Sequence, residues 1–281
     1  MTSNNYVVAI CTLGENPNLL QCVSSLLEIK DVTSCQFKIL VVLNRNESQF
    51  VFDSRVQVVF ESNRGYANVR NRAIDATPED FHLIFLDDDE IPTTTWFEAL
   101  VTSHRSFPAD VIFGPVLPEP MVETISYRDK FKSQFESLRD GATAKQAGAG
   151  NMLIPSYLLD NELVRFDPFF NESGSEDTDL CFKLRKKGVK IRYSKNAQIF
   201  ELQNRERLTP EYINFRKLKD ICNYSLVIRR NYGVIGISWR FFTLSVRILY
   251  YSVLSLSSDK HIFNRTAYFK SWQTLIRGHL S

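Results

Sequence analysis

Residues 82–92 read HLIFLDDDEIP, an apolar run that passes directly into four consecutive acids. Similar short apolar runs occur elsewhere in the chain, at Tyr6–Cys11, Phe37–Leu43, Val56–Phe60 and Val111–Val116. Segments with helical spacing alternate with them, at Pro17–Ile29, Tyr66–Ala76 and Thr94–His104. Near-continuous apolar strands that alternate with helices predict an α/β fold with a mostly parallel central sheet covered on both faces. Ligands of such sheets bind beyond the carboxyl ends of the strands, so the residues after each run are candidates for a site.

The pattern changes beyond residue 114. A Gly/Ala-rich turn at 146–151 leads into a short predicted strand, Met152–Ile154. A helix is then predicted over Glu176–Lys187, because acids occupy its first turn, bases its last, and Gly188 ends it. Past Leu208 the sequence predicts long helices, and it is rich in basic residues to its end.

The composition is that of an ordinary globular protein. The 281 residues carry a formal net charge of +2, and 44% of them are hydrophobic. Collagen-like, disordered and disulfide-scaffold classes are therefore excluded. The five cysteines are scattered, odd in number and never in a CxxC pair, which indicates a reducing compartment and argues against a zinc ribbon. The N-terminal residues lack the basic region of a secretory signal, so we expect a cytoplasmic protein.

Charge is divided unevenly along the chain. Residues 1–200 contain 21 Lys/Arg and 27 Asp/Glu, a net of −6, whereas residues 201–281 contain 13 and 5, a net of +8. A basic tail on an acidic body predicts an anionic partner for the tail, such as nucleic acid or membrane phosphates. The alternative is a basic face that only improves solubility.

The acids at 87–90 predict a divalent-cation site. Four adjacent carboxylates repel one another, and a hard cation such as Mg²⁺ or Mn²⁺ resolves the repulsion because it prefers oxygen ligands and often adds substrate phosphates. Alternation along an extended chain would place Asp87 and Asp89 on one side and Asp88 on the other. Asp87 and Asp89 are then the predicted metal ligands. The alternative is a solvated acidic turn that caps the next helix.

Two further segments are candidates for chemistry. Asp177 lies in the first turn of the helix that begins at Glu176, where it either caps the helix or serves as a general base toward an acceptor hydroxyl. Residues 63–72, NRGYANVRNR, follow the third strand and open a helix. A helix N-terminus with nearby arginines predicts a diphosphate site, and the alternative is a basic surface face. The phosphate-loop, dinucleotide, zinc-protease and hydrolase-elbow motifs are all absent.

Taken together, these motifs resemble the family 2 glycosyltransferases with the GT-A fold, over roughly residues 6–230. The matching segments, in chain order, are Val7–Thr12, Leu40–Asn44, Asn63–Asn71, Asp87–Asp89 and Glu176-Asp177. The stretches LDDDEIP, FGPVLPEP, AGNMLI, RFDPFF and SGSEDTDLCFKL are similar to bacterial enzymes of exopolysaccharide assembly, including succinoglycan-type glucosyltransferases. Five motifs in the right order and spacing make the resemblance specific.

The resemblance implies an inverting, metal-dependent transfer of a sugar from a nucleotide-diphosphate donor, with a UDP-sugar expected, to a glycan or polyprenyl-linked acceptor. It implies Asp177 as general base, with Glu176 orienting the acceptor or Asp177. Asp87 and Asp89 would hold Mg²⁺ or Mn²⁺. The implied donor-binding residues are Thr12, Asn44, Arg70, Asp87, Asp88, Arg205 and Arg207, the two last closing over the diphosphate. The organisation implied is a Rossmann-like GT-A domain over 1–207, nucleotide-binding to about residue 115 and acceptor-binding beyond, with a helical extension over 208–281.

Two positions depart from the family pattern, and three other classes are alternatives. Asn44 stands where the family usually has an Asp that contacts the base, and Val69 replaces the Ala of A-R-N. A phospho-aspartate phosphatase would need its Asp-x-Asp at the first strand and a later GDxxxD, which is absent. A sugar-phosphate nucleotidyltransferase would open with a Gly-rich loop that 7–16 lacks. The third alternative is a non-catalytic protein that binds a nucleotide sugar or a glycan.

The apolar tail segment Val234–Ser257 predicts a helix in a membrane interface. Its uncharged stretches are shorter than the roughly 18–20 residues of a spanning helix, because Arg240 and Arg247 interrupt them. Seven residues apart, the two arginines would form a narrow basic stripe on a broad apolar helix, and basic neighbours at 229–265 would add attraction to anionic lipid. We therefore expect peripheral association with the inner face of the cell membrane. The alternative is a helix packed on the domain or across a dimer interface.

Overall fold

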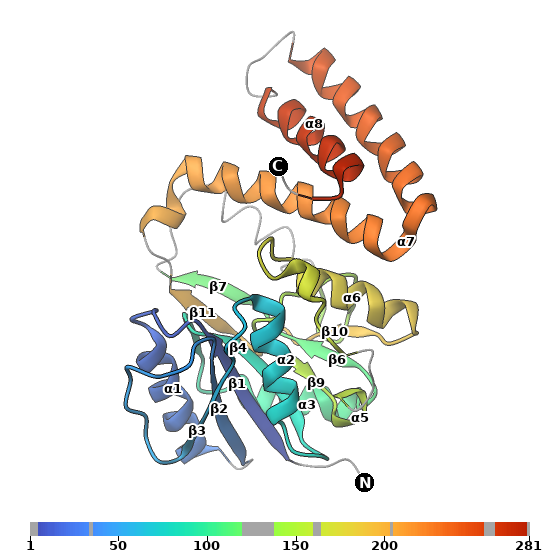
Figure 1. Cartoon of the computed structure of the whole chain (residues 1–281). Helices are drawn as coiled ribbons and strands as arrows, with labels where there is room; N and C mark the ends of the chain where they lie inside the picture. The colour runs from blue at the N-terminus through green and yellow to red at the C-terminus, as the bar shows by residue number, and fades with distance from the viewer. Residues whose placement is uncertain are drawn as a thin grey trace.

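The computed structural model describes residues 5–33, 36–119, 138–159, 164–202, 205–255 and 262–279. An eight-stranded mixed sheet forms the centre, in the order β3-β2-β1-β4-β9-β6-β10-β8 (Figure 1). Its strands are β1 Tyr6–Thr12, β2 Phe37–Leu43, β3 Val56–Phe60, β4 His82–Asp87, β6 Val111–Phe113, β8 Thr143–Ala144, β9 Met152–Ile154 and β10 Ile191–Tyr193. The first four pair in parallel, and β9 runs antiparallel between β4 and β6. The predicted mostly parallel sheet is confirmed, because β6 and β10 run in the same direction as the first four strands and only β8 and β9 are reversed.

Helices cover both faces of the sheet because successive residues of a strand point to opposite sides. In β1, Val7 and Ala9 pack with α2 (Tyr66–Ala76) and α6 (Glu176–Lys186). Tyr6, Val8 and Ile10 pack with α1 (Leu19–Val32) and α3 (Trp96–Ser106). The short α5 (Ser156–Leu159) and the 3₁₀ turn η2 (Pro168–Phe170) complete the layer on the α2 side. Two continuous apolar cores thus fix the sheet, and its carboxyl edge is left for polar residues.

A second, three-stranded sheet was not predicted. Strands β5 (Glu90–Pro92), β11 (Ile199–Leu202) and β7 (Val116–Glu119) pair in the order β5-β11-β7. The prediction of one strand over Val111–Val116 is wrong because the chain breaks at Gly114. A Cβ there would lie 2.0 Å from the Ala197 carbonyl oxygen, so only glycine permits this approach. The small sheet continues the acidic turn after β4.

The C-terminal region is helical, as the sequence predicts. Helix α7 (Pro210–Leu254) follows the 3₁₀ turn η3 (Arg205–Leu208), crosses the domain and bends at Gly233, which has φ 55° and ψ −141°. Its first half packs on α6 through the cluster of Phe182 and Leu226. Its second half forms a hairpin with α8 (Ile262–Arg277) that projects away from the sheets (Figure 1). Among the described residues, no helix is both long and apolar enough to span a membrane.

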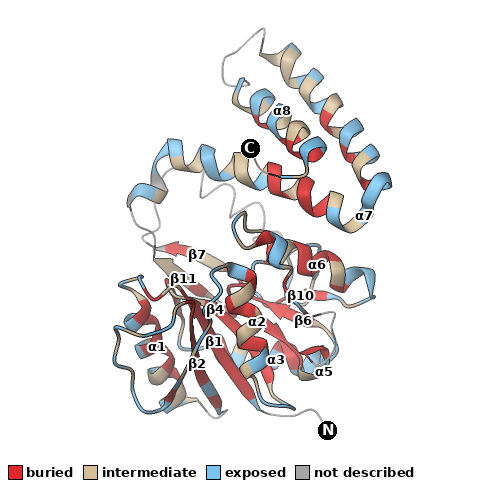
Figure 2. Cartoon of the chain, viewed as in Figure 1, coloured by how far each residue is buried: buried red, intermediate tan, exposed pale blue. Residues whose placement is uncertain are grey.

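The predicted exposed arginine stripe on this hairpin is wrong for Arg240. That side chain is buried, donates from Nε to the Ser225 hydroxyl at 3.0 Å and lies over the Tyr224 ring. Arg247 lies over the ring of Tyr268 on α8. The bend at Gly233 turns this face of the second half back onto the first, and large apolar side chains are exposed on the outer face instead. Figure 2 shows that exposed stretches recur along this second half. Lys260, a basic neighbour invoked in the prediction, lies outside the described residues.

Candidate functional site

The candidate site lies at the carboxyl edge of the parallel half of the sheet. β1 ends at Thr12 and β4 ends at Asp87, and the two strands are neighbours. The Thr12 hydroxyl donates to one Asp88 oxygen, and the Asn16 amide donates to the other at 2.8 Å. The loop after β1 is therefore tied to the acidic turn after β4. Burial raises the pKa of Asp88, although these two hydrogen bonds oppose the shift.

Arg70 joins the acidic turn to the second acidic motif. It reaches from α2 with 7% of its surface exposed, donates from Nη2 to Asp87 at 3.0 Å, and pairs through Nη1 with Glu176 at the start of α6. Segments at 70, 87 and 176 thus meet at one guanidinium. The predicted role of Arg70 beside a donor stays a prediction, but its position between the two acidic motifs is a finding that the sequence did not supply.

A second arginine holds the other side of the acidic turn. Arg207, in η3, donates to Asp89 at 3.0 Å and to Glu201 of β11 at 3.1 Å. Burial and the neighbouring Asp87 raise the pKa of Asp89 to about 6, and burial with Asp89 raises that of Glu201 to about 7. Of the predicted pair of closing arginines, Arg207 therefore contacts the site, and the side chain of Arg205 lies outside the described part.

The fourth acid of the run is a structural residue. Glu90 is buried and accepts the backbone N–H of Asp87 at 2.7 Å, which closes the turn between β4 and β5. A Cβ on Gly150 would lie 2.2 Å from its Oε1, so the Gly/Ala-rich turn must pass this carboxylate without a side chain. Burial raises the pKa of Glu90 well above its usual value.

Asp177 has the surroundings expected of a proton acceptor. One of its oxygens accepts the backbone N–H of Thr178 at 2.6 Å. The other faces Gly148, whose missing Cβ would still be 3.9 Å away. Burial raises its pKa, while the charge of Arg70 opposes the rise. Ser175 occupies the N-cap position of α6, and its side chain makes no capping hydrogen bond to the helix. A backbone hydrogen bond therefore holds one carboxylate oxygen, and the other lies beside the small residues of the Gly/Ala-rich turn.

Two predicted features of the site are wrong. Alternation cannot place Asp87 and Asp89 on one side, because β4 ends at Asp87 and the chain turns at residues 88 and 89. The N-terminus of α2 is not a free anion site either. The Asn171 side-chain oxygen accepts from the N–H groups of Ala67 at 2.9 Å and Asn68 at 3.2 Å, so a protein residue already satisfies them.

Asn44 reaches the same edge with its hydrogen-bonding capacity largely used. Its amide donates to the carbonyls of Glu61 at 3.0 Å and Asn63 at 2.8 Å, and its oxygen accepts from Gly65 at 2.8 Å. Both amide hydrogens are therefore committed to the turn that precedes α2. In this geometry Asn44 positions that turn and has no N–H left for a nucleotide base.

The acidic turn after β4 supplies two carboxylates, those of Asp87 and Asp89, that could contribute to a site for a hard cation. Among the described residues, no three His, Cys, Asp or Glu side chains are grouped so that they could hold a metal ion. Asp87 and Asp89 supply two carboxylates, and the Asp87 side chain keeps 40% of its surface exposed. Mg²⁺ and Mn²⁺ are commonly held by one or two carboxylates, with waters and substrate phosphates as the other ligands. The donor set suits such an ion only together with a phosphate-bearing ligand.

Several residues of the site were missed from the sequence. Asn16, Asn171 and Glu201 make the contacts above, yet each stands alone in a loop or a small-sheet strand. The available signals were weak: Asn16 precedes a Pro at a helix start, and Glu201 follows an apolar pair. Their partners lie 72, 104 and 6 residues away in sequence, so the first two contacts follow only from the fold.

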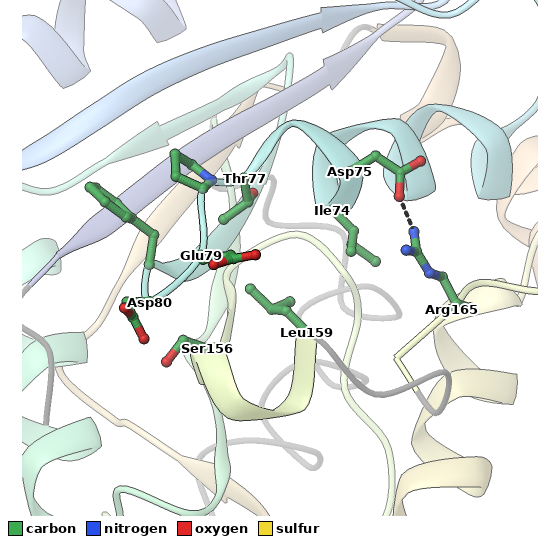
Figure 3. Close-up of a pocket in the computed structure, with 10 residues that line it drawn as sticks. Ile74, Asp75, Thr77, Glu79, Asp80, Ser156, Leu159 and Arg165 are labelled. Atoms are coloured by element: carbon green, nitrogen blue, oxygen red, sulfur yellow. Dashed lines mark hydrogen bonds and ion pairs between the residues drawn. The ribbon is translucent and has the colours of Figure 1, made fainter.

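A second pocket lies at the far end of β4 and does not join this site. It has a volume of about 310 Å³ and lies between the end of α2, residues 77–81 and α5 (Figure 3). Its one arginine, Arg165, pairs with Asp75, and Glu79 and Asp80 add further acids. The pocket carries no arrangement that suits an anionic ligand.

Comparison with known proteins gives a family and a fold. The sequence pattern of the family described as Glycosyl transferase family 2 matches residues 7–159. The crystal structure of S. aureus TarS 1-349 is similar, with a TM-score of 0.58 at 12% identity over 98% of this chain and 92% of that chain. The same TarS fragment in complex with UDP-GlcNAc gives 0.56. GalNAc-T7 with UDP, GalNAc and Mn²⁺ gives 0.54 at 12% identity, over 79% of this chain and 50% of that one. No curated protein sequence matches the chain.

Proposed function

Because the chain belongs to glycosyl transferase family 2 and is a glycosyltransferase, we propose that it transfers a sugar from a UDP-sugar to a hydroxyl acceptor with inversion. One observation carries the proposal: Arg70 holds Asp87 and Glu176 together, so a donor cluster and a candidate base adjoin at one edge. The structural neighbours in complex with UDP-GlcNAc or with UDP and Mn²⁺ support a UDP donor. Membership of this family favours a glycosyltransferase over a sugar-phosphate nucleotidyltransferase.

The donor half of the proposed site consists of the acidic turn and its two arginines. Asp87 and Asp89 would hold Mg²⁺ or Mn²⁺, which stabilises the negative charge of a leaving diphosphate when it is bound. Arg70 and Arg207 carry further positive charge at the same place. Thr12 and Asp88 close the wall beside β1. Asn44 would act indirectly, by holding the turn before α2.

The acceptor half is centred on Asp177. The Asp177 carboxylate would take the proton of the acceptor hydroxyl, whose oxygen bonds to the anomeric carbon. The bond from that carbon to the diphosphate breaks on the opposite face, and its electron pair leaves with UDP. A pKa raised by burial makes the carboxylate a stronger base than an ordinary Asp. Glu176, fixed by Arg70, would orient the acceptor or Asp177.

A UDP-release assay over a panel of nucleotide sugars tests this proposal. Release that needs Mg²⁺ or Mn²⁺, rises with acceptor and yields the inverted anomer by NMR is the expected result. The matched control is the Asp75→Ala variant, because Asp75 is an exposed acid that pairs with Arg165 away from the candidate site. Binding of a nucleotide sugar without turnover across the panel would instead indicate a non-catalytic binding protein.

The proposal extends to the place of action. Residues 1–207 would form the catalytic domain, and the hairpin of α7 and α8 would rest on the inner face of the cell membrane beside a polyprenyl-linked acceptor. Support comes from the outer apolar face of the hairpin, where Val234, Ile235, Trp239 and Phe242 are 61–83% exposed. Exposed apolar patches of this kind bind partners or membranes. Flotation of the full chain and of a chain ending near Asn231 on liposomes tests it, and equal partitioning would contradict it.

A further inference from the structure

A cavity lies in the elbow where α7 bends, and neither proposed half of the catalytic site uses it. We call it the elbow pocket: it has a volume of about 530 Å³ and lies between the two halves of the helix. Its wall contains Tyr224 and Ile228 from the first half and Trp239, Arg240, Thr243 and Arg247 from the second. Gly233 makes the bend through its positive φ. Gly236 allows the close approach, because a Cβ there would lie 3.0 Å from the Ile228 carbonyl oxygen.

The elbow pocket contains a buried cation that has no counter-ion in the part of the chain that the structure describes. Arg240 is 8% exposed, and its polar contact is the Nε donation to the uncharged Ser225 hydroxyl. Among the described residues, no carboxylate pairs with it, whereas buried Arg70 pairs with two. Burial, followed by the charge of Arg247, lowers the pKa of Arg240. Buried charges in proteins are normally paired, so this guanidinium is suited to binding an anionic group.

The surroundings specify what kind of anion fits. Arg247 supplies a second guanidinium at the same wall, and Thr243 supplies a hydroxyl. Guanidinium groups match phosphate oxygens in geometry and charge. Asp220 is the carboxylate of the lining, but it is exposed at the rim, where solvent screens it. The pocket therefore has the chemistry of a phosphate site.

The apolar face specifies that the phosphate belongs to a lipid. Trp239 lines the pocket and is also 68% exposed on the outer face, next to Phe242 at 61%. A phosphate in the pocket would have its hydrocarbon chains adjacent to that face. We propose that the elbow pocket binds the phosphate head group of an anionic membrane lipid, an inference that rests on the membrane association proposed above.

Flotation of the full chain with two kinds of vesicle tests the proposal. Phosphatidylcholine vesicles, with or without one-fifth phosphatidylglycerol, are compared for the wild type and for Arg240→Gln and Arg247→Gln. The control is Arg277→Gln, which removes the same charge from an exposed residue in the last turn of α8, outside the pocket. Each pocket variant is expected to lose about fivefold in affinity for the anionic vesicles, and the control less than about twofold. Equal losses in all three variants would overturn the pocket and indicate general attraction to the surface.

Three further readouts separate the ways in which the proposal can fail. Arg247 is exposed, so Arg247→Gln keeps the test valid if Arg240→Gln does not fold, and thermal melting checks both. Trp239→Ala and Phe242→Ala should weaken binding to both kinds of vesicle. If only these two variants matter, membrane association stands and the pocket is overturned. Stabilisation by glycerol 3-phosphate without any vesicle binding would overturn the lipid assignment. UDP release by the pocket variants should equal that of the wild type, so a failed transferase proposal is distinguishable.

Discussion

Two arginines are buried among the described residues, and they lie in regions of opposite character. At the carboxyl edge of the sheet, Arg70 is 7% exposed and pairs with Asp87 and Glu176. In the elbow of α7, Arg240 is 8% exposed and has a hydroxyl and an aromatic ring as neighbours. The two arginines are equally buried but differ in their electrostatic surroundings: two carboxylates balance the charge of Arg70, whereas no carboxylate of the described residues pairs with Arg240. The balanced region joins two acidic motifs, and the unbalanced one faces an apolar surface.

The largest effect is expected from the acidic turn. Asp89→Ala should abolish transfer, by more than about a thousandfold, because it removes one of the two carboxylates that would hold the cation. Nucleotide binding should also lose its dependence on Mg²⁺ or Mn²⁺. UDP release and calorimetric titration with UDP measure the two effects. Near-normal activity at low metal concentration, with Asp75→Ala as the control, would show that the donor site lies elsewhere.

Asp177→Asn should reduce turnover by at least about a hundredfold while UDP still binds, because the amide cannot take the acceptor proton. Steady-state kinetics and UDP titration give the two quantities separately. Glu172→Gln, at an exposed acid before the same helix, is the control and should leave turnover unchanged. Loss of UDP affinity with intact turnover would make Asp177 a donor ligand or a helix cap.

The comparison of the two arginines predicts opposite responses to the same substitution. Arg70→Met leaves Glu176 buried without its partner, so it should lower the free energy of unfolding by about 3–5 kcal/mol. Arg240→Met leaves no charge unpaired and should change stability by less than about 1 kcal/mol, in either direction. Urea denaturation of both variants measures this difference. Equal destabilisation would show that Arg240 has a counter-ion in the chain and would remove the basis of the elbow pocket.

The sequence predicted the first four strands, helix α2 and strand β9 well, because local pattern determines them. Tyr66–Ala76 and Met152–Ile154 were predicted to the residue, since each is bounded by turn residues and buried on a defined face. The acidic motifs were also visible as local patterns. The Asn171 cap on α2 and the Arg70 bridge were not, because their partners lie 104 and 106 residues away.

The error on the C-terminal helix has a similar cause. Helical spacing does place Arg240 and Arg247 near one face, but only the bend at Gly233 decides whether that face meets lipid or protein. A glycine in a long helix is compatible with a straight helix as well as a bend, so the sequence alone could not choose. The burial of the Arg240 guanidinium, with no carboxylate of the described residues beside it, follows only from the way the two halves of α7 pack together.

The smallest effect is expected at the opposite end of the sheet, where acid should act on the sheet domain and spare the hairpin. His104 lies 3.3 Å from His82 in a buried pair, and burial, followed by His82 and Arg105, lowers its pKa from 6.5 to about 4. A lowered folded-state pKa means that the neutral ring stabilises the fold above pH 6.5, and that this contribution is lost as the pH falls toward 4. The difference in free energy of unfolding between the wild type and His104→Gln should therefore shrink by about 1–2 kcal/mol across that range.

Urea denaturation at several pH values, followed by tryptophan fluorescence, measures this difference. Trp96 reports on the sheet domain, and Trp239 and Trp272 report on the hairpin. Variants that retain only Trp96 or only the hairpin tryptophans assign the signal. A constant difference between wild type and variant from neutral pH to pH 4 would show that His104 titrates alike in the folded and unfolded chains.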